Sequence, residues 1–597
     1  MTPDTRNMIA AASLSMLVLV GWQLYFVEPE LEAQRDAYNT QQVANDLAGN
    51  ELAGNDLPSP SNGVDGGQAG TSTGTGAGAS LSAGVALGTE QARPADTAKR
   101  IAINTPLVRG SLTTQGARID DVVLTAYQET LEEGADDITL LRKISDSQPY
   151  FAEFGWIGDG ADIALPNDKT IWAASGDELS PQSDVTLTYD NGEGLIFSRT
   201  LSIDEQYMIT INDAVTSARD ETLRLLPYGL IRRFGTPETT GIYILHEGPI
   251  GVVDTTLKEE GYDDLRDGPI DYKSEENGGW IGFTDKYWLT ALVPDQAQKS
   301  NFALRALAGN EDRYQADYLG TAMVLSAGET ISYQTRFFAG AKVLTMIDAY
   351  SEELNIANFD LAIDFGWFYF MTKPFFYAIN WLNSLLGNFG FAILAFTVVI
   401  RLVLYPLANK SYRSMAKMRA LSPKLTKMRE QYKDDRTKLN QEMMSLYKTE
   451  KVNPAAGCLP ILLQIPVFFA LYKVLYVSIE MRQAPFIGWI HDLSEIDPTS
   501  LFNLFGLLPY STNFVPDFLN IGVWPILMGV SMFIQQRLNP PPPDPIQAKI
   551  FQWMPIFFTF LLAGFPAGLV IYWTWNNTLS ILQQWWITRQ IEKSMKA

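Results

Sequence analysis

The chain has 597 residues, 46% of them hydrophobic, and a formal net charge of −22. The acidic excess lies in residues 28–366, whose net charge is −31, whereas the remaining residues together carry +9. This balance argues against nucleic-acid binding by the large acidic part, because phosphate contacts need basic side chains. The single cysteine, Cys458, excludes an intrachain disulfide and is expected to be a small buried residue.

Residues 1–27 predict an N-terminal transmembrane anchor. After Arg6, the stretch from Met8 to Val27 is apolar and has about the 20 residues that a spanning helix needs. No small-residue cleavage site follows it, so we expect an uncleaved anchor rather than a removed signal peptide. Residues 28–100 become rich in Gly, Ala, Ser and Thr, with too little apolar surface to fold, and predict a disordered periplasmic linker.

Residues 101–345 consist of short runs of alternating apolar and polar residues, which are typical of β-strands. Turn sequences at 190–194, 277–279 and 308–310 separate such runs and predict β-hairpins. A region of this length and pattern predicts a large all-β sandwich domain. His246 stands apart from any metal-ligand cluster or nucleophile motif, so we expect it to be a structural or surface residue.

After residue 346 the chain becomes apolar and basic. Residues 346–387 form a connection, in which the aromatic-rich stretch 367–386 is expected to lie as a helix in the membrane interface. Residues 388–597 predict a five-helix core, in which the last two spans are separated by a turn at Gly564–Gly568. The predicted spans lie near residues 388–408, 457–479, 519–537, 550–565 and 567–588.

With the N-terminal anchor, these spans make six transmembrane helices. Residues 409–451 carry twelve Lys/Arg against five Asp/Glu, which predicts a cytoplasmic segment. Arg6 and the basic residues after position 588 place both termini on the same side. The expected fold class is therefore a multi-pass α-helical membrane protein with a large all-β sandwich domain outside the cytoplasmic membrane, which makes it periplasmic if the cell has an outer membrane.

The basic segment 409–451 predicts a cytoplasmic helical hairpin, with helices from Ser411 to about Tyr432 and from Thr437 to about Lys448. Met and Leu residues recur in it at three- and four-residue spacing. One interpretation is a hairpin that buries its own seam. The other is a docking surface for varied apolar segments, because methionine packs against many shapes, and its basic face could meet anionic lipids. The contact residues expected for docking are Met415, Met418, Leu425 and Met428.

Arg401 lies in the middle of the first apolar span of this core. A guanidinium keeps its charge at any accessible pH, so it needs water, a counter-charge or acceptors inside the membrane, where its placement costs at least about 2.5–3.5 kcal/mol. Thr397 lies four residues earlier on the same helix face, and Gln464 interrupts another apolar run. Because the spans contain no obvious carboxylate partner, we expect a wet cavity open to the cytoplasm.

Ordered motifs after residue 360 are similar to those of a known family. They include Ser414–Arg419, Gln441–Met444, Glu450–Pro454, Gly457–Pro460, Gln464–Pro466, Glu480–Phe486, Trp489–Ser494 and Phe565–Val570. Together they closely resemble Gram-negative members of the YidC/Oxa family of membrane protein insertases.

The resemblance implies insertion and folding of nascent membrane proteins in the inner membrane through a hydrophilic groove open to the cytoplasm. Arg401, Thr397 and Gln464 would line this groove, and Trp573 would stand in it where the family has a tyrosine. The implied partners are nascent membrane proteins, the Sec translocon, the ribosome and signal-recognition-particle pathway transiently, and membrane lipids, but not DNA. The outer loop 498–520 is longer than the family suggests and apolar enough to rest on the membrane.

The sequence shows no nucleotide motif, metal cluster or catalytic triad, so we expect no cofactor, no metal and no enzymatic activity. One alternative is a secondary transporter or channel that uses Arg401 as an anion site, although the paired broken helices or repeats of such proteins are missing. Another is a receptor whose β domain binds a ligand, for which five further spans would be excessive.

Overall fold

The computed structural model falls into strands up to Ala341 and mainly helices after it. The predicted anchor, residues 28–97 of the predicted linker, and Cys458 lie outside the residues that the structure describes. The described residues are 98–132, 134–159, 163–239, 245–307, 312–366, 368–432, 435–450, 459–508, 515, 519–539 and 545–596.

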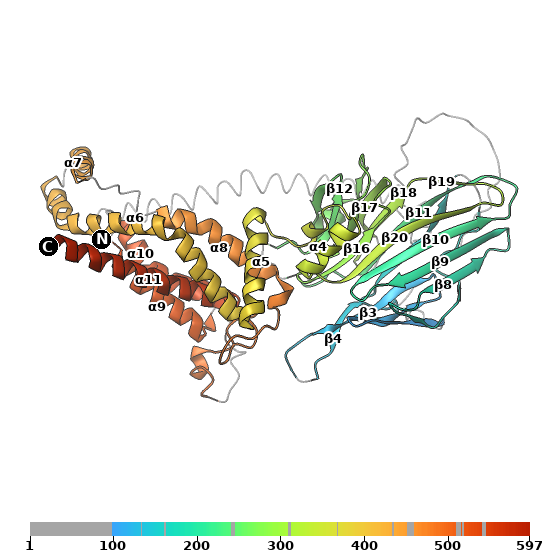
Figure 1. Cartoon of the computed structure of the whole chain (residues 1–597), viewed down its shortest axis with the longest axis horizontal. Helices are drawn as coiled ribbons and strands as arrows, with labels where there is room; N and C mark the ends of the chain where they lie inside the picture. The colour runs from blue at the N-terminus through green and yellow to red at the C-terminus, as the bar shows by residue number, and fades with distance from the viewer. Residues whose placement is uncertain are drawn as a thin grey trace, which may run out of the picture. The chain divides into compact units, whose positions relative to one another are not determined.

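Two sheets form the β domain (Figure 1). The first has eleven strands in the order β14-β17-β18-β11-β5-β3-β2-β1-β7, with β19 paired to β11 and β4 to β3. All its pairings are antiparallel except that of β1 with β7. Its strands are β1 (Arg100–Asn104), β2 (Val108–Thr113), β3 (Arg118–Gln128), β4 (Asp137–Leu141), β5 (Tyr150–Gly158), β7 (Glu178–Leu179), β11 (Leu223–Phe234), β14 (Ile270–Tyr272), β17 (Ser300–Leu307), β18 (Arg313–Gly320) and β19 (Met323–Leu325).

The second sheet has nine strands in the order β13-β12-β15-β16-β20-β10-β9-β8-β6. A short helix, α3 (Tyr262–Asp267), lies in the chain between its strand β13 and strand β14 of the first sheet. The strands of this second sheet are β6 (Ala173–Ala174), β8 (Val185–Asp190), β9 (Leu195–Ile203), β10 (Met208–Ser217), β12 (Gly248–Val253), β13 (Thr256–Glu259), β15 (Trp280–Thr284), β16 (Trp288–Val293) and β20 (Thr330–Ala341).

The alternating sequence pattern explains this architecture. In β9, every second side chain from Leu195 to Ile203 is buried, so one face of the strand packs on the core. Trp280, Phe283 and Phe337 lie fully buried in this core, and the predicted β-sandwich is confirmed.

Of the three predicted hairpin turns, one is confirmed, one was wrong, and the turn at 308–310 lies outside the described residues. Residues 190–194 join the antiparallel pair β8 and β9, and the described strands before and after 308–310, β17 and β18, are also an antiparallel pair. Residues 277–279 instead lie between β14 and β15, which belong to different sheets. A glycine-rich turn permits a sharp change of direction, but the strand that becomes the partner is decided by packing at a distance.

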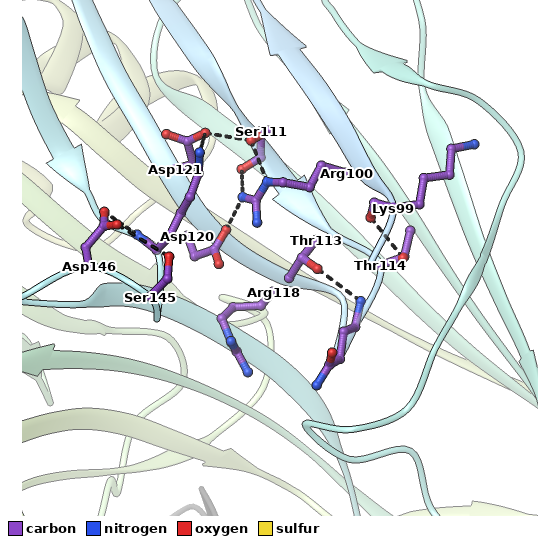
Figure 2. A network of polar contacts seen from close by, with 12 residues as sticks. Lys99, Arg100, Ser111, Thr113, Thr114, Arg118, Asp120, Asp121, Ser145 and Asp146 are labelled. Carbon is purple, nitrogen blue, oxygen red and sulfur yellow. Dashed lines mark hydrogen bonds and ion pairs between the residues drawn. The ribbon is translucent and has the colours of Figure 1, made fainter. Parts of the chain in front are cut away.

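Charged side chains connect the first three strands (Figure 2). The guanidinium of Arg100 on β1 donates to the Ser111 hydroxyl of β2 at 2.9 Å and forms an ion pair with the fully buried Asp120 of β3. Ser111 in turn donates to Asp121 at 2.6 Å. These contacts hold the N-terminal strands in register through side chains as well as through the backbone.

The C-terminal region consists mainly of helices (Figure 1). Among the described residues, one segment, Phe389–Met415, is long and apolar enough to cross a membrane, and Gln464–Val477 and Ala548–Gly564 are shorter apolar helices. The main helices are α4 (Leu344–Glu353), α5 (Tyr369–Leu386), α6 (Phe389–Gln431), α7 (Arg436–Thr449), α8 (Leu459–Val477), α9 (Val523–Leu538), α10 (Pro545–Leu561) and α11 (Ala567–Lys596).

Helix α6 corrects one predicted boundary. The sequence predicted a span ending near residue 408 and a separate hairpin helix from Ser411, but the structure has one helix of 43 residues. It continues through Pro406 and Pro423, because a proline removes one backbone donor while the hydrogen bonds on either side of it remain.

The hairpin of α6 and α7 turns most of its apolar stripe inward. Leu421, Leu425 and Tyr447 are buried, and Met415 packs against a small cluster that includes Ile587 of α11. This burial favours the interpretation of a hairpin that covers its own seam. The four residues predicted for docking are all at least partly buried: Met415, Met418, Leu425 and Met428.

Helix α5 has one anchored face and one exposed apolar face. The Lys373 amine pairs with Asp348 at 2.9 Å and with Asp360 at 2.7 Å, which ties the helix to the preceding segment. Phe376 and Ile379 are buried. A different face exposes large apolar side chains, namely Phe370, Trp381 and Leu385. Such a face, rich in aromatic residues, suits a helix at a membrane surface.

Candidate functional site

A small cavity surrounds Arg401 between helices α6, α8 and α11. The centres of water-sized molecules can reach about 30 Å³ of it, which is room for one or two waters. Side chains of both polar and apolar kinds line it: Phe396, Thr397, Ile400, Arg401, Leu404, Leu407, Ala408, Gln464, Val467, Leu471, Tyr572 and Asn576. Three of the predicted groove residues, Arg401, Thr397 and Gln464, are therefore brought together.

The guanidinium of Arg401 is held by acceptors on α11. Its Nε donates to Asn576 Oδ1 at 3.0 Å, and its Nη2 donates to the same oxygen at 2.5 Å and to the Asn576 carbonyl at 3.0 Å. Nη2 also donates to the Ser580 hydroxyl. All these acceptors are uncharged, so they solvate the guanidinium without cancelling its positive charge.

This arrangement changes the expectation of an arginine that depends on water. The sequence argument required water, a counter-charge or acceptors, and the structure supplies acceptors from a second helix. The cavity is also far smaller than a helix, whose diameter with side chains is about 10–12 Å. In this conformation the cavity has room for a little water beside the guanidinium, but not for a helix.

Thr397 and Trp573 have different surroundings. Thr397 is buried, and its hydroxyl donates to the carbonyl of Ile393 one turn earlier at 2.7 Å. Trp573 is not among the described residues that line the cavity. Its ring packs against the rings of Phe468 and Phe558, with centroids 4.7 Å and 5.8 Å away. The neighbouring Tyr572 lines the cavity instead, so a phenol is present beside Arg401 although the predicted position holds an indole.

Asn576 and Ser580 were not singled out from the sequence as partners of Arg401. Tyr572, Asn576 and Ser580 are spaced by four residues, which places them on one face of α11. This spacing within an apolar run was the available signal. Asn577, which follows Asn576, points elsewhere and donates to Ser531 of α9 at 3.0 Å.

Glu480 lies just beyond α8 in the 3-10 turn η5 (Ile479–Met481). Burial raises the pKa of its carboxyl from 4.5 to about 7, and backbone hydrogen bonding at Leu344 opposes this only in part. One carboxyl oxygen, Oε1, has no hydrogen-bond partner among the described residues. The buried carboxyl of Glu480 therefore lies at the end of the helix core. None of the hydrogen bonds of Arg401 described above goes to it.

The described residues contain no cluster of three or more His, Cys, Asp or Glu that could hold a metal ion. His246 is held by its surroundings: its backbone N–H donates to Asp364 at 3.2 Å, and its Nε2 lies 2.9 Å from the carbonyl of Pro249. These contacts agree with a structural role for His246.

Two family descriptions match nearly all of the chain after residue 100. The YidC periplasmic domain matches residues 100–378, and the family described as 60Kd inner membrane protein matches residues 381–594. A membrane protein insertase YidC from Methylobacterium sp. (strain 4-46) is 48% identical over 601 residues, which cover 98% of this chain and 95% of the relative. The relative of that name from Granulibacter bethesdensis is 50% identical, covering 84% of this chain and 88% of its own length.

Among solved structures, an active YidC insertase with its first transmembrane domain resolved is 18% identical, with a TM-score of 0.33, and covers 81% of this chain and 92% of its own. The chain is also similar to a galactose mutarotase-like protein from Lactobacillus casei, at 12% identity and a TM-score of 0.28, over 40% of this chain and 99% of the other. The family rests on the sequence relatives. The chain belongs to the YidC family of membrane protein insertases, whose members are inner-membrane proteins and not enzymes.

Proposed function

We propose that this insertase receives nascent membrane proteins at the Arg401 cavity and passes their apolar helices into the bilayer. The observation that carries the proposal is a guanidinium inside an apolar helix core whose bonds go to neutral acceptors. Its positive charge stays uncompensated by these bonds. An acidic or polar segment of a client that enters the core is therefore attracted to Arg401, while the acceptors of α11 hold the side chain in place.

The proposal requires the cavity to widen. Gln464 on α8 and Asn576 on α11 both line the cavity around Arg401, so separation of these helices enlarges the polar space. Water that enters supplies the hydrogen bonds that a crossing polar segment needs. Thr397 and Gln464 line this widened groove, which opens to the cytoplasm.

The driving force is physical rather than chemical. Transfer of a helix of about 20 apolar residues from water to lipid is favourable by tens of kcal/mol of free energy, at roughly 25 cal/mol per Å² of apolar surface removed from water. An acidic outer segment that crosses also gains or loses about 2.3 kcal/mol per charge for each 100 mV of membrane potential. The contribution of Arg401 is to hold such a segment transiently.

We further propose the membrane topology on which this route depends. Helices α6, α8, α9, α10 and α11 cross the inner membrane, and residues 1–27 supply a sixth span. The twelve basic residues of 409–451 support a cytoplasmic hairpin, and Arg6 with the basic residues after position 588 supports cytoplasmic termini. The acidic β domain then lies in the periplasm, and α5 lies in the interface.

The proposed partners follow from this placement. The hairpin of α6 and α7 first meets clients delivered by the ribosome and the signal-recognition-particle pathway, and its basic face contacts anionic lipids. Met415, Met418, Leu425 and Met428 become available to apolar segments when the hairpin opens. The insertase acts alone or beside the Sec translocon.

Photocrosslinking in inverted membrane vesicles tests the route. Probes at Gln464, Thr397 and Trp573 are compared with one at Leu402, which neighbours Arg401 but is largely exposed on the outside of α6. A short two-span client is stalled on ribosomes at increasing lengths. We expect Gln464 and Thr397 to crosslink the client at successive lengths, whereas Leu402 crosslinks lipid.

The route is wrong if Gln464 and Thr397 capture only neighbouring helices while the client still inserts. Loss of all uptake of a small anion by the Arg401→Ala variant, with client insertion intact, would instead favour the transporter or channel. Deletion of the β domain separates the receptor alternative, because an insertase retains activity with residues 346–597 intact.

A further inference from the structure

A short apolar turn lies between α8 and α9. This apolar turn, Ser500–Leu508, has no ionisable residue, and the sequence stays uncharged from Thr499 to Pro516. Leu507 is 82% exposed. Five further large apolar side chains of the turn are also exposed: Leu501, Phe502, Leu504, Phe505 and Leu508. So dense an exposed apolar surface marks an interaction site.

Most backbone N–H groups of the turn are hydrogen-bonded. Its first residues form the 3-10 helix η6 (Leu501–Asn503). The Ser500 carbonyl accepts from the Phe505 N–H at 2.7 Å, and the Asn503 carbonyl accepts from the Leu508 N–H at 3.0 Å. The Asn503 side chain accepts from the Gly506 N–H at 2.9 Å. Irregular backbone can enter a lipid phase only when its polar groups are paired in this way.

The turn also holds its side chains outward at a conformational cost. Leu504, Phe505 and Gly506 have positive φ angles of 51°, 59° and 92°. Residues other than glycine rarely adopt this left-handed conformation. The backbone cost is steric and is paid in any solvent, whereas the exposed leucines and phenylalanines are unfavourable only in water. An apolar surrounding would therefore offset the cost and explain why the fold keeps this turn.

The root of the turn is joined rigidly to α9. Asp497 accepts from the Trp524 N–H at 2.9 Å, and the Thr499 hydroxyl accepts from the Val523 N–H at 3.0 Å, so both side chains cap the start of the helix. Gly522 permits this approach, because a Cβ there would lie 2.5 Å from the Asp497 carboxyl carbon. The depth of the turn and the depth of α9 are therefore linked.

We propose that the apolar turn inserts into the bilayer surface and fixes the depth of the adjoining end of α9. The occupant of its exposed side is lipid, for two reasons. The turn carries no charge with which to choose a protein partner, and its root is bonded to α9, which exposes an apolar face of its own. That face consists of Leu527, Val530, Phe533 and Ile534. The inference rests on the proposed crossing of the membrane by α9.

Spin-label accessibility in proteoliposomes made only of lipid and the full chain tests this contact. Since Cys458 is the single cysteine, Cys458→Ala provides a background without cysteine, once its insertion activity is verified. Nitroxides are placed at Leu507→Cys, at Val530→Cys on α9, and at Ile171→Cys, an exposed apolar residue of the β domain. Collision rates are measured with oxygen, which concentrates in lipid, and with a neutral nickel chelate, which stays in water.

We expect the ratio of oxygen to nickel collisions at Leu507 to resemble that at Val530 and to exceed that at Ile171 several-fold. A Leu507 ratio equal to that of Ile171, with Val530 in lipid, overturns the inference and leaves the proposed span intact. A water-like ratio at Val530 overturns the span itself. If Leu507 is in water in these vesicles and is protected only in native membranes, the occupant is a protein and the lipid contact is wrong.

A second variant tests whether the depth matters. Leu507→Asp places a charge at the tip, and Ile171→Asp is the matched control. We expect the first to move a label at Val530 toward water and the second to leave it unchanged. No movement in either variant contradicts the proposed link between the turn and α9.

Discussion

Two arginines, one in each region of the molecule, are stabilised in different ways. Arg199 on β9 of the sandwich is 1% exposed and binds the carboxylate of Asp213, with Nε 2.6 Å from Oδ1. Its Nη2 also donates to the carbonyl of Phe154 at 2.8 Å. Arg401 on α6 is only partly buried and binds the neutral oxygens of α11, chiefly those of Asn576.

The difference separates a structural charge from an available one. The carboxylate of Asp213 neutralises Arg199, so the pair contributes to packing and exerts little field beyond itself. Within the described part of the chain, Arg401 has neutral acceptors and no ion pair, so its field extends into the cavity. A core that only needed to bury an arginine would place a carboxylate beside it, and the acidic half of this chain does so repeatedly.

Removal of Arg199 should have the largest effect on stability. The variant Arg199→Met leaves the carboxylate of Asp213 buried without its partner, and breaking a buried pair in this way costs about 3–5 kcal/mol. Urea unfolding of the full chain in detergent, followed by the protease resistance of the β domain, measures the loss. The double variant Arg199→Met/Asp213→Leu should recover much of it, and an unimproved double variant would contradict the assignment of the pair.

Glu480 is the acidic counterpart, buried where no described residue forms a hydrogen bond with its Oε1 atom. Its pKa rises from 4.5 to about 7, so the folded state binds more protons than the unfolded state between these values. Stability should therefore fall as the pH rises through this window, by up to about 3 kcal/mol at pH 8. The melting temperature at pH 5 and pH 8 measures the fall.

The variant Glu480→Gln should lose most of this pH dependence and be more stable than the parent at pH 8. Glu353→Gln, at an exposed position of α4, is the control. Equal pH dependence in the parent and in Glu480→Gln would show that other groups cause it.

The variant Asn576→Ala tests the neutral acceptor of Arg401. It removes the side-chain oxygen that accepts two bonds from Arg401, and hydrogen bonds to charged groups contribute about 1.5–3 kcal/mol. We expect lower thermal stability in detergent and weaker insertion of clients with acidic outer segments. Asn577→Ala is matched in chemistry and position but loses only the bond to Ser531, so it should insert these clients normally. Equal insertion defects in the two variants would remove the special role of the Arg401 acceptors.

The smallest effect is expected at an exposed ion pair of the hairpin. Lys424 lies 2.9 Å from Glu450, and its side chain is 62% exposed. Because such pairs contribute at most about 1 kcal/mol, Lys424→Ala should change the melting temperature little. A large loss of stability would mean that the hairpin is held by this pair rather than by its buried seam.

The sequence predicted whether a segment is a strand or a helix better than it predicted which segments pair or pack together. Alternation along β9 indicates a strand buried on one face, because successive side chains point to opposite sides. The partner of β14 cannot be read in this way, which is why the turn at 277–279 was mistaken for a hairpin. The end of the span near residue 408 was wrong for a related reason, since Pro406 suggests a boundary but the surrounding hydrogen bonds continue α6.

The candidate site shows the same division. Arg401 stands out because it is charged in an apolar run, whereas Asn576 lies 175 residues later and is identified only when the helices are packed. Trp573 was predicted in the lining and Tyr572 is found there. Adjacent helical positions are about 100° apart around the axis at 3.6 residues per turn, so a shift of one residue moves a side chain out of the cavity.

The unbroken course of α6 makes it a lever. At 1.5 Å per residue along the helix axis, the 43 residues from Phe389 to Gln431 cover about 64 Å, of which about 45 Å separate Arg401 from the hairpin end. The helix bends along this course (Figure 1), and Pro406 and Pro423 lie within it. Movement of the hairpin tip is therefore transmitted to the contacts around Arg401 through continuous helical backbone, less the part lost to bending at the two prolines.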